Sequence, residues 1–297
     1  MISAESIAQN LLDDLGINSY PIDPFAICSN LRIHVFKENF DGLEGVLLFD
    51  GKSASIGLNK RQTLLTREKF SVAHELGHFS MDINFGSQQV FKCTKNMIES
   101  FNKNLEIELR ADRFASELIL PSKLVNPLMK EQEPSWDLIK EISTKFEVSL
   151  LPSAIKYMGL TQLSCCVVIS KKNKILFYRP SKEFRYGLQM DSRILSEGCF
   201  AHKSMKGESI PNNFEVVSAD NWITGRKVNR DSEIYEWSLP LNSYGTVMTI
   251  LWDDGLVDTD DDSMTYNKTE DDGLGNYSYG GVDNFPWEPP SFHKKKR

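Results

Sequence analysis

The chain has 297 residues, 40% of them hydrophobic, and a formal net charge of −7 at neutral pH, which is enough apolar content to bury one or two cores. No apolar run approaches the roughly 20 residues that cross a bilayer, and the first residues lack a charged-then-apolar signal pattern, so we expect no membrane association. The five cysteines show no framework spacing, which fits reduced thiols in a cytoplasmic protein.

The first part of the chain is expected to contain short helices followed by a small sheet. Apolar spacing and helix-start signals predict two helices, over residues 3–15 and 23–30. Strand-like composition predicts three strands, over residues 32–36, 45–49 and 54–58. Asp50-Gly51 is typical of a tight turn, so the last two strands should form a hairpin. An edge of this sheet could bind an extended peptide by backbone pairing.

A helix is predicted over residues 66–80, with Thr66 as its N-cap, and it contains His-Glu-Leu-Gly-His at 74–78. Residues four apart share one face of a helix, so the imidazoles of His74 and His78 can converge on one metal ion. Glu75 lies about 100° round the helix, near that ion without having to bind it. The pattern is typical of zinc hydrolases, although a histidine pair at this spacing also occurs on solvated or packed faces.

A third ligand is expected downstream, because catalytic zinc is held by three protein ligands and keeps one position open. Residues 108–118 predict a second helix on which Glu108 and Asp112 share a face. We expect Glu108 to bind the ion and Asp112 to accept the free N–H of a ligating histidine. Glu106 is the rival ligand, but no acidic residue follows it four positions later. The alternative is that Glu108 and Asp112 are an ordinary pair of acidic residues on the protein surface.

Together these motifs resemble the ImmA/IrrE family of zinc metallopeptidases, over roughly the first 160 residues. The likeness includes Phe-Ser-Val-Ala at 70–73 and Leu-Ile-Leu-Pro at 118–121. It implies a gluzincin-like domain in which His74, His78 and Glu108 bind zinc and Glu75 is the catalytic base. It also implies cleavage of helix-turn-helix repressors, which switches on stress-response or mobile-element genes. Arg110 departs from many relatives, which carry Glu or Gln there, but it points about 160° away from Glu108.

Residues 81–104 show no regular pattern, and we expect a loop at the rim of the substrate cleft, with a plain surface loop as the alternative. After a linker containing Pro127 and Pro134, residues 136–146 and 150–158 have the outline of a helix-turn-helix. Its lysines are balanced by acidic residues, so little phosphate neutralisation is available. We therefore regard DNA contact as weakly supported and favour packing against the peptidase domain or docking of a partner.

From residue 163 onward the apolar pattern changes to a period of two, which predicts a second α+β domain. Its strands are expected at 166–169, 174–178, 214–218, 234–239 and 244–252. Some relatives carry a sensor-like domain here, so the resemblance implies sensing, with substrate docking as the alternative. Residues 253–297 contain 11 acidic and 5 basic residues and are predicted to be disordered. These residues carry a net charge of −6 out of the whole-chain −7, so residues 1–252 are nearly neutral.

The sequence thus predicts an α+β protein in four parts: a peptidase domain with a three-stranded sheet (1–125), a helix-turn-helix-like segment (126–162), a second α+β domain (163–252) and an acidic tail (253–297). The predicted activity is zinc-dependent endopeptidase cleavage of a protein substrate, most readily a helix-turn-helix repressor. The alternative is a non-catalytic zinc-containing regulator or toxin–antitoxin component that binds a repressor or DNA. Mn²⁺ could replace Zn²⁺, and a ferrous oxygenase is a third interpretation.

Overall fold

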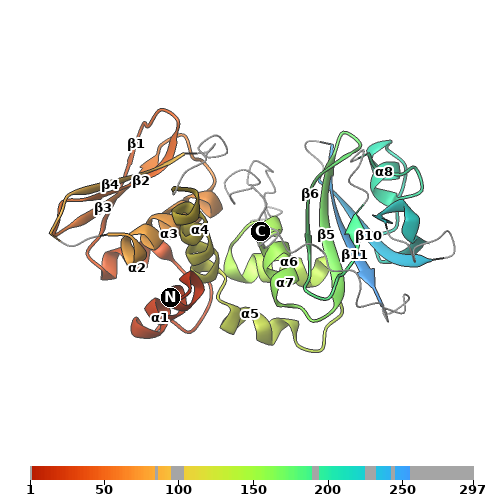
Figure 1. The fold of residues 1–297 in the computed structure, drawn as a ribbon, viewed down its shortest axis with the longest axis horizontal. Helices are drawn as coiled ribbons and strands as arrows, with labels where there is room; N and C mark the ends of the chain where they lie inside the picture. Colours follow the sequence, from red (N-terminus) through yellow and green to blue (C-terminus); the bar gives the residue numbers. More distant parts are fainter. Residues whose placement is uncertain are drawn as a thin grey trace, which may run out of the picture. The chain divides into compact units, whose positions relative to one another are not determined.

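The computed structural model describes residues 2–83, 86–94, 104–188, 194–224, 232–241 and 245–254 (Figure 1). These residues form two compact units, unit 1 with residues 2–128 and 142–152, and unit 2 with residues 129–141 and 153–254. The predicted segment 126–162 is therefore divided between the units. Of the predicted tail, only residues 253 and 254 lie within the described part. None of the described helices is long and apolar enough to span a membrane.

Unit 1 is built on a four-stranded sheet in the order β1-β3-β2-β4. The strands are β1 (His34–Glu38), β2 (Leu43–Phe49), β3 (Ala54–Asn59) and β4 (Gln89–Thr94). β1 runs parallel to β3, and β2 runs antiparallel to both β3 and β4. The predicted β2–β3 hairpin is present, and the Asp50 side chain accepts the backbone N–H groups of Lys52 and Ser53 in its turn.

The fourth strand corrects two predictions, the three-stranded sheet and the loop over residues 81–104. β4 lies within that predicted loop and pairs with β2 along its length. The inward side chains of β4 are Phe91 and Cys93, whereas Val90 and Lys92 are exposed. This alternation is only a few residues long, and the exposed Val90 breaks the expected pattern of apolar residues facing inward. Pairing with β2, which sequence periodicity does not report, makes it a strand.

The described part of unit 1 also contains the helices α1 (Ala4–Asp14), α2 (Pro24–Asn30), α3 (Leu65–Met81), α4 (Asn104–Ile119) and α5 (Ser122–Met129). α1 and α2 begin as expected, because Ser3 and Asp23 accept backbone N–H groups at the N-caps. α5 replaces the predicted linker. Pro127 lies inside it, and in so short a helix a proline near the end removes a single backbone hydrogen bond.

The N-cap predicted for α3 is wrong. The helix begins at Leu65, and the cap position, Leu64, makes no side-chain capping bond. Thr66 lies in the first turn, where its hydroxyl accepts a hydrogen bond from Ser149 (3.3 Å) instead of capping the helix. The same end of α3 carries Lys69, whose ammonium pairs with Glu147 at 2.6 Å.

Ser149 and Glu147 belong to the turn between α6 (Trp136–Phe146) and α7 (Leu150–Leu160). Glu147 has a positive φ of 53°, and the hydroxyl of Ser143 donates to the carbonyl of Val148 (2.7 Å) across the turn. The turn between α6 and α7 therefore contacts α3, the helix that carries His74 and His78. Packing against the peptidase domain was one of the two roles that the sequence favoured for this segment.

α3 packs against β2, β3 and α4. Gly77 makes the contact with α4 possible, since a Cβ at this position would lie 3.1 Å from the Cα of Ala111. Buried apolar side chains fill the core around this contact: Leu47, Ile56, Leu58, Val72, Ala73, Leu76, Phe114, Ala115 and Leu118. The two helices that carry the sequence motifs are thus held face to face by a close-packed interface.

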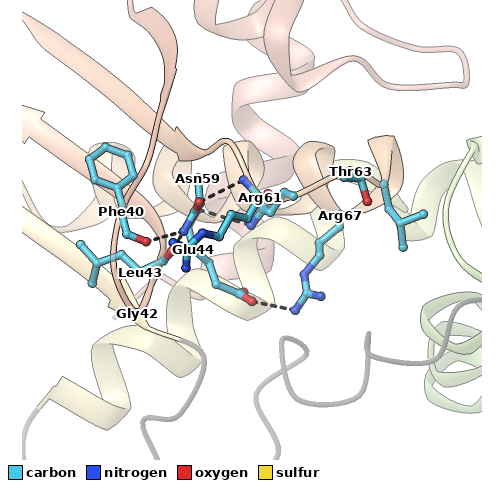
Figure 2. A pocket seen from close by; sticks show the side chains of 10 residues that line it. Phe40, Gly42, Leu43, Glu44, Asn59, Arg61, Thr63 and Arg67 are labelled. Carbon is cyan, nitrogen blue, oxygen red and sulfur yellow. Dashed lines mark hydrogen bonds and ion pairs between the residues drawn. The ribbon is translucent and has the colours of Figure 1, made fainter.

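A pocket of about 490 Å³ opens beside the start of α3 (Figure 2). Its lining comprises Phe40, Gly42, Leu43, Glu44, Asn59, Arg61, Gln62, Thr63, Leu64 and Arg67. The amide of Asn59 donates to the carbonyls of Phe40 (2.6 Å) and Leu43 (2.7 Å), which holds the loop between β1 and β2. Arg67 pairs with Glu44 at 2.7 Å. Arg67 lies seven residues before His74, so the pocket lies about 10 Å along the same helix face.

Unit 2 contains a five-stranded antiparallel sheet in the order β6-β5-β11-β10-β8. Its strands are β5 (Ser164–Lys171), β6 (Lys174–Pro180), β8 (Glu215–Ser218), β10 (Glu233–Leu241) and β11 (Thr246–Asp253). They overlap all five predicted segments. The remaining elements are β7 (Gly187–Leu188), α8 (Phe200–Met205), η2 (Ala219–Asn221) and β9 (Ile223–Thr224). A core around the fully buried Trp222 joins this sheet to α8.

Candidate metal centre

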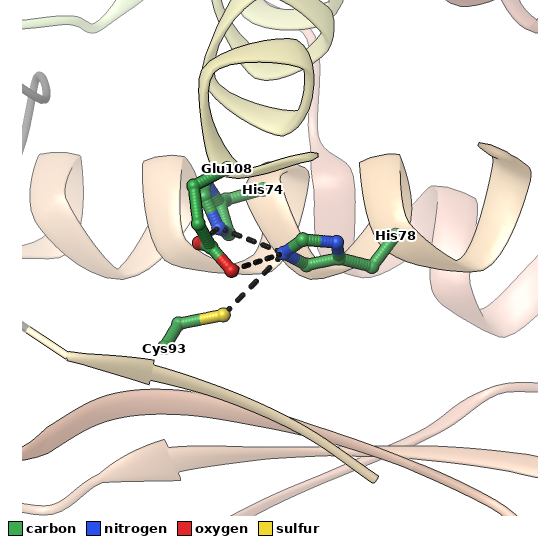
Figure 3. A group of neighbouring side chains, drawn as sticks. All are labelled: His74, His78, Cys93 and Glu108. Carbon is green, nitrogen blue, oxygen red and sulfur yellow. Dashed lines mark hydrogen bonds and ion pairs between the residues drawn. The ribbon is translucent and has the colours of Figure 1, made fainter. Parts of the chain in front are cut away.

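The imidazoles of His74 and His78 meet on one face of α3, with their Nε2 atoms 3.1 Å apart. The carboxylate of Glu108, from α4, lies against both rings: one oxygen is 3.0 Å from Nε2 of His74 and the other 3.5 Å from Nε2 of His78. Figure 3 shows these three side chains converging between the helices. The predicted ligands therefore share one point in space, whereas Glu106 is exposed and stands outside the group.

Two further carboxylates face the outer nitrogens of the rings. Asp112 lies 2.8 Å from Nδ1 of His74, in the position expected for it. Asp82 lies 2.9 Å from Nδ1 of His78 and is itself paired with Arg110. A carboxylate at Nδ1 fixes an N–H there, which turns the Nε2 lone pair toward the centre. Sequence reasoning missed Asp82, the C-cap of α3, although its position four residues after His78 was available as a signal.

Cys93 approaches the same point from β4, on the side opposite α4 (Figure 3). Its Sγ is 3.5 Å from Nε2 of His78. One ligand atom from each of His74, His78, Cys93 and Glu108 lies within 4.8 Å of the others. The sequence analysis assigned no role to Cys93, because the strand that delivers it was itself missed.

Glu75 is buried between α3 and β2, with 1% of its surface exposed. Gly45 on β2 makes room for it, since a Cβ there would collide with Oε1 of Glu75. Its other oxygen, Oε2, is buried and has no hydrogen-bond partner among the described residues. A buried acceptor without a partner is rare in native proteins and points to a group that binds there.

The close contacts within the centre shift the pKa values of the two histidines and of Glu108. Burial alone would lower the pKa of His74, but Cys93, Asp112 and Glu108 outweigh it and raise that pKa well above its usual value. Burial likewise opposes protonation of His78, yet Asp82, Cys93 and Glu108 raise its pKa to about 11. Glu108 shows the reverse, because its hydrogen bonds to both imidazoles overcome burial and lower its pKa to about 2. A bound cation would take the place of these imidazole protons.

The chemistry of the donor set fits a divalent metal ion. Two imidazole nitrogens and a carboxylate oxygen are ligands that Zn²⁺ accepts, and a thiolate suits it equally. The group is largely buried and held by supporting carboxylates, and beside it lies an acceptor, Oε2 of Glu75, that no donor within the described part of the chain satisfies. These properties define a candidate metal centre of the type that metallopeptidases build from two adjacent helices.

Comparisons with known proteins agree with this class. Residues 28–153 match the family model described as the IrrE N-terminal-like domain. Metallopeptidase ImmA of Bacillus subtilis (strain 168) is 26% identical over 152 residues, which is 49% of this chain and 83% of that protein. A solved structure, a Mycobacterium tuberculosis transcriptional regulator, has a similar fold, with a TM-score of 0.52 over 84% of this chain and 75% of that one at 11% identity.

Residues 28–153 are thus similar to the ImmA/IrrE family, as the resemblance of the motifs implied. The matched segment begins in α2 and ends in α7, and it includes both motif helices as well as β4.

Proposed function

We propose that this protein is a zinc-dependent endopeptidase that hydrolyses a peptide bond in a protein substrate, a transcriptional repressor of the helix-turn-helix type. The observation that carries the proposal is Glu75, a buried carboxylate without a hydrogen-bond partner at Oε2, beside two imidazoles aimed at one point. Burial raises the pKa of Glu75, which suits a group that accepts and returns a proton near neutral pH.

In this proposal His74, His78 and Glu108 hold the ion, and Asp112 and Asp82 orient the two imidazoles. When bound, a divalent ion polarises the scissile carbonyl and acidifies water. Glu75 accepts the proton of the attacking water and returns it to the leaving amine, so that one carboxylate serves as base and then as acid. Gly45 leaves the space in which Glu75 does this.

Two features support a polypeptide substrate. β4 is an edge strand of the sheet among the described residues and lies beside the centre, so an extended segment can add to it by backbone pairing. The pocket at the start of α3 provides room for a substrate side chain along the same helix face. A role in gene regulation is supported by the similar fold of a protein that is called a transcriptional regulator.

A second candidate function is a metal-containing regulator that binds a repressor without cutting it. Cys93 favours this alternative, because a fourth protein donor is typical of structural zinc sites. In that case the buried centre would stabilise the domain, and Glu75 would have no role in a reaction.

The decisive experiment incubates the zinc-loaded full chain with a candidate helix-turn-helix repressor, with and without a chelator. We expect fragments of the repressor only without the chelator. Glu75→Gln should retain zinc and lower the cleavage rate by at least about 10²–10⁴-fold, the usual contribution of a general base. Glu106→Gln, on the exposed part of α4, is the matched control and should cleave normally. Cleavage by Glu75→Gln at the wild-type rate would remove Glu75 as the base.

A further inference from the structure

Cys93 occupies a distinctive place among the five cysteines. Its Sγ faces an imidazole of α3 at 3.5 Å and lies in one cluster with Glu108. Its neighbour Phe91 also faces this centre and stacks on the ring of His78, with centroids 5.1 Å apart and planes 15° apart. β4 therefore forms a wall of the metal centre, and its two inward side chains both contact the ligand set.

The register of the sheet places Cys93 beside the proposed base. Cys93 pairs with Gly45 across β2 and β4, and Gly45 is the residue whose missing side chain makes room for Glu75. The thiol also interacts with the Glu75 carboxylate and with both imidazoles. Cys93 thus lies close both to the proposed metal ligands and to Glu75, in the region where an attacking water would have to be.

The number of protein ligands decides whether a metal ion at this centre keeps an open coordination position. A catalytic zinc site uses three protein ligands and keeps a fourth position open, whereas four protein ligands close the site. His74, His78 and Glu108 already supply three, and a metal ion deprotonates a coordinating thiol outright. The four ligand atoms lie within 4.8 Å of one another. Ligand atoms of one tetrahedral ion, with Zn–S near about 2.3 Å and the other bonds near about 2.0–2.2 Å, lie roughly 3.3–3.7 Å apart, so the side chains have to close in by about 1 Å at most to share an ion.

We propose that Cys93 is a fourth protein ligand that closes the metal centre, so that the conformation described here is a latent one and hydrolysis requires the thiolate to leave the ion. The inference rests on the proposed function, because a closed site matters only if an open one is catalytic. Departure of Cys93 is a ligand exchange in which water replaces the thiolate, and no electrons are transferred. Any event that displaces Cys93 from the ion, including the binding of a substrate segment along the edge of β4, would start the reaction.

The test replaces zinc by cobalt in the full chain and records the absorption spectrum. We expect the near-ultraviolet thiolate-to-cobalt band in the wild type and its loss in Cys93→Ala. Cys28→Ala is the matched control, because Cys28 is a buried cysteine of α2 in the same unit, and it should keep the band. X-ray absorption of the zinc-loaded wild type should show a sulfur ligand at about 2.3 Å. Should Cys93→Ala fail to fold, Cys93→Ser preserves the side-chain size.

Closure is tested separately with acetohydroxamate, a small chelating ligand that needs an open coordination position. It should change the visible cobalt spectrum of Cys93→Ala at concentrations that leave the wild type unchanged. A wild type that binds metal through nitrogen and oxygen alone, or that binds acetohydroxamate as readily as the variant, overturns the inference while the peptidase proposal stands. Absence of stoichiometric metal binding overturns both.

Discussion

Two buried glutamates, one in each unit, show how the same side chain serves different ends. Glu75 of unit 1 and Glu236 of unit 2 are almost fully buried, and burial raises the pKa of both. The carboxylate of Glu236 accepts three hydrogen bonds of 2.8 Å each, from Trp222, Ala201 and Ser238. Oε2 of Glu75 accepts none from the described residues.

The difference separates a structural network from a site. The donors around Glu236 come from three different elements, α8, the η2 region and β10 itself, so the carboxylate ties them together. A satisfied network of this kind rigidifies a core and needs no ligand. Around Glu75 lie the imidazoles of His74 and His78, the thiol of Cys93 and the carboxylate of Glu108, and none of these groups donates a hydrogen bond to Oε2. In the proposed function, a cation and a substrate complete the second arrangement.

The largest expected effect concerns Glu236→Ala, which removes the acceptor of the buried Trp222 and Ala201 N–H groups, whereas the Ser238 hydroxyl can still donate to Thr249. We expect the free energy of unfolding of unit 2 to fall by about 3 kcal/mol, at roughly 1.5 kcal/mol for each unsatisfied group. Denaturant unfolding followed by tryptophan fluorescence would measure it. Glu233→Ala, an exposed residue at the start of the same strand, should change stability by less than about 0.5 kcal/mol. Equal effects would remove the structural role of Glu236.

The next effect tests the ligand set of the other centre. Glu108→Ala should weaken zinc binding by at least about a hundredfold, which exceeds the usual loss for a supporting residue. Glu106→Ala should leave it unchanged, because Glu106 is exposed on the same helix. Competition with a chromophoric chelator would give both affinities. Weaker binding in Glu106→Ala alone would transfer the ligand role to the rival residue.

Asp112→Ala should have a smaller effect of about 10–100-fold on zinc affinity, as is usual when an outer partner of a metal-bound histidine is removed. The physical reason is that Nδ1 of His74 loses the carboxylate 2.8 Å away that fixes the orientation of the ring. The same chelator competition measures this effect. Asp137→Ala, which removes an exposed carboxylate on α6, should bind zinc normally.

The helices of this centre could be predicted from the sequence because each carries its information locally. His74 and His78, and likewise Glu108 and Asp112, are four residues apart, so helical geometry alone places each pair on one face. That Glu108 and not Glu106 faces the imidazoles follows from which side of α4 packs at Gly77, which is a tertiary fact. The sequence could only suggest it through Asp112.

Cys93 and the strand that carries it could not be predicted for a different reason. β4 is short and lies between polar segments, and it becomes a strand by pairing with β2, some forty residues earlier in the chain. Local pattern does not report such long-range pairing. Asp82 is an intermediate case, since its spacing from His78 was visible but its pairing with Arg110 on another helix was not.

The smallest expected effect returns to the two glutamates and concerns the sign of one substitution. In the metal-free protein, the raised pKa of Glu75 means that folding favours its neutral form. That contribution to stability is complete below the unfolded pKa of about 4.3 and is lost as the pH rises through the folded pKa. Glu75→Gln keeps a neutral side chain at every pH. It should therefore raise the free energy of unfolding by about 1 kcal/mol at pH 7 and have no effect near pH 4.

Glu236→Gln should instead lower the free energy of unfolding at pH 7. The substitution replaces one carboxylate oxygen by an NH₂ group, which cannot accept the hydrogen bond that Trp222 or Ala201 donates there. Chemical unfolding of both variants in the presence of a chelator, at pH 4 and pH 7, measures the two signs. Stabilisation by both substitutions would mean that the hydrogen bonds of Glu236 do not compensate its burial. Destabilisation by both would mean that Glu75 is held by partners within the protein, and the contrast between the two centres would then be lost.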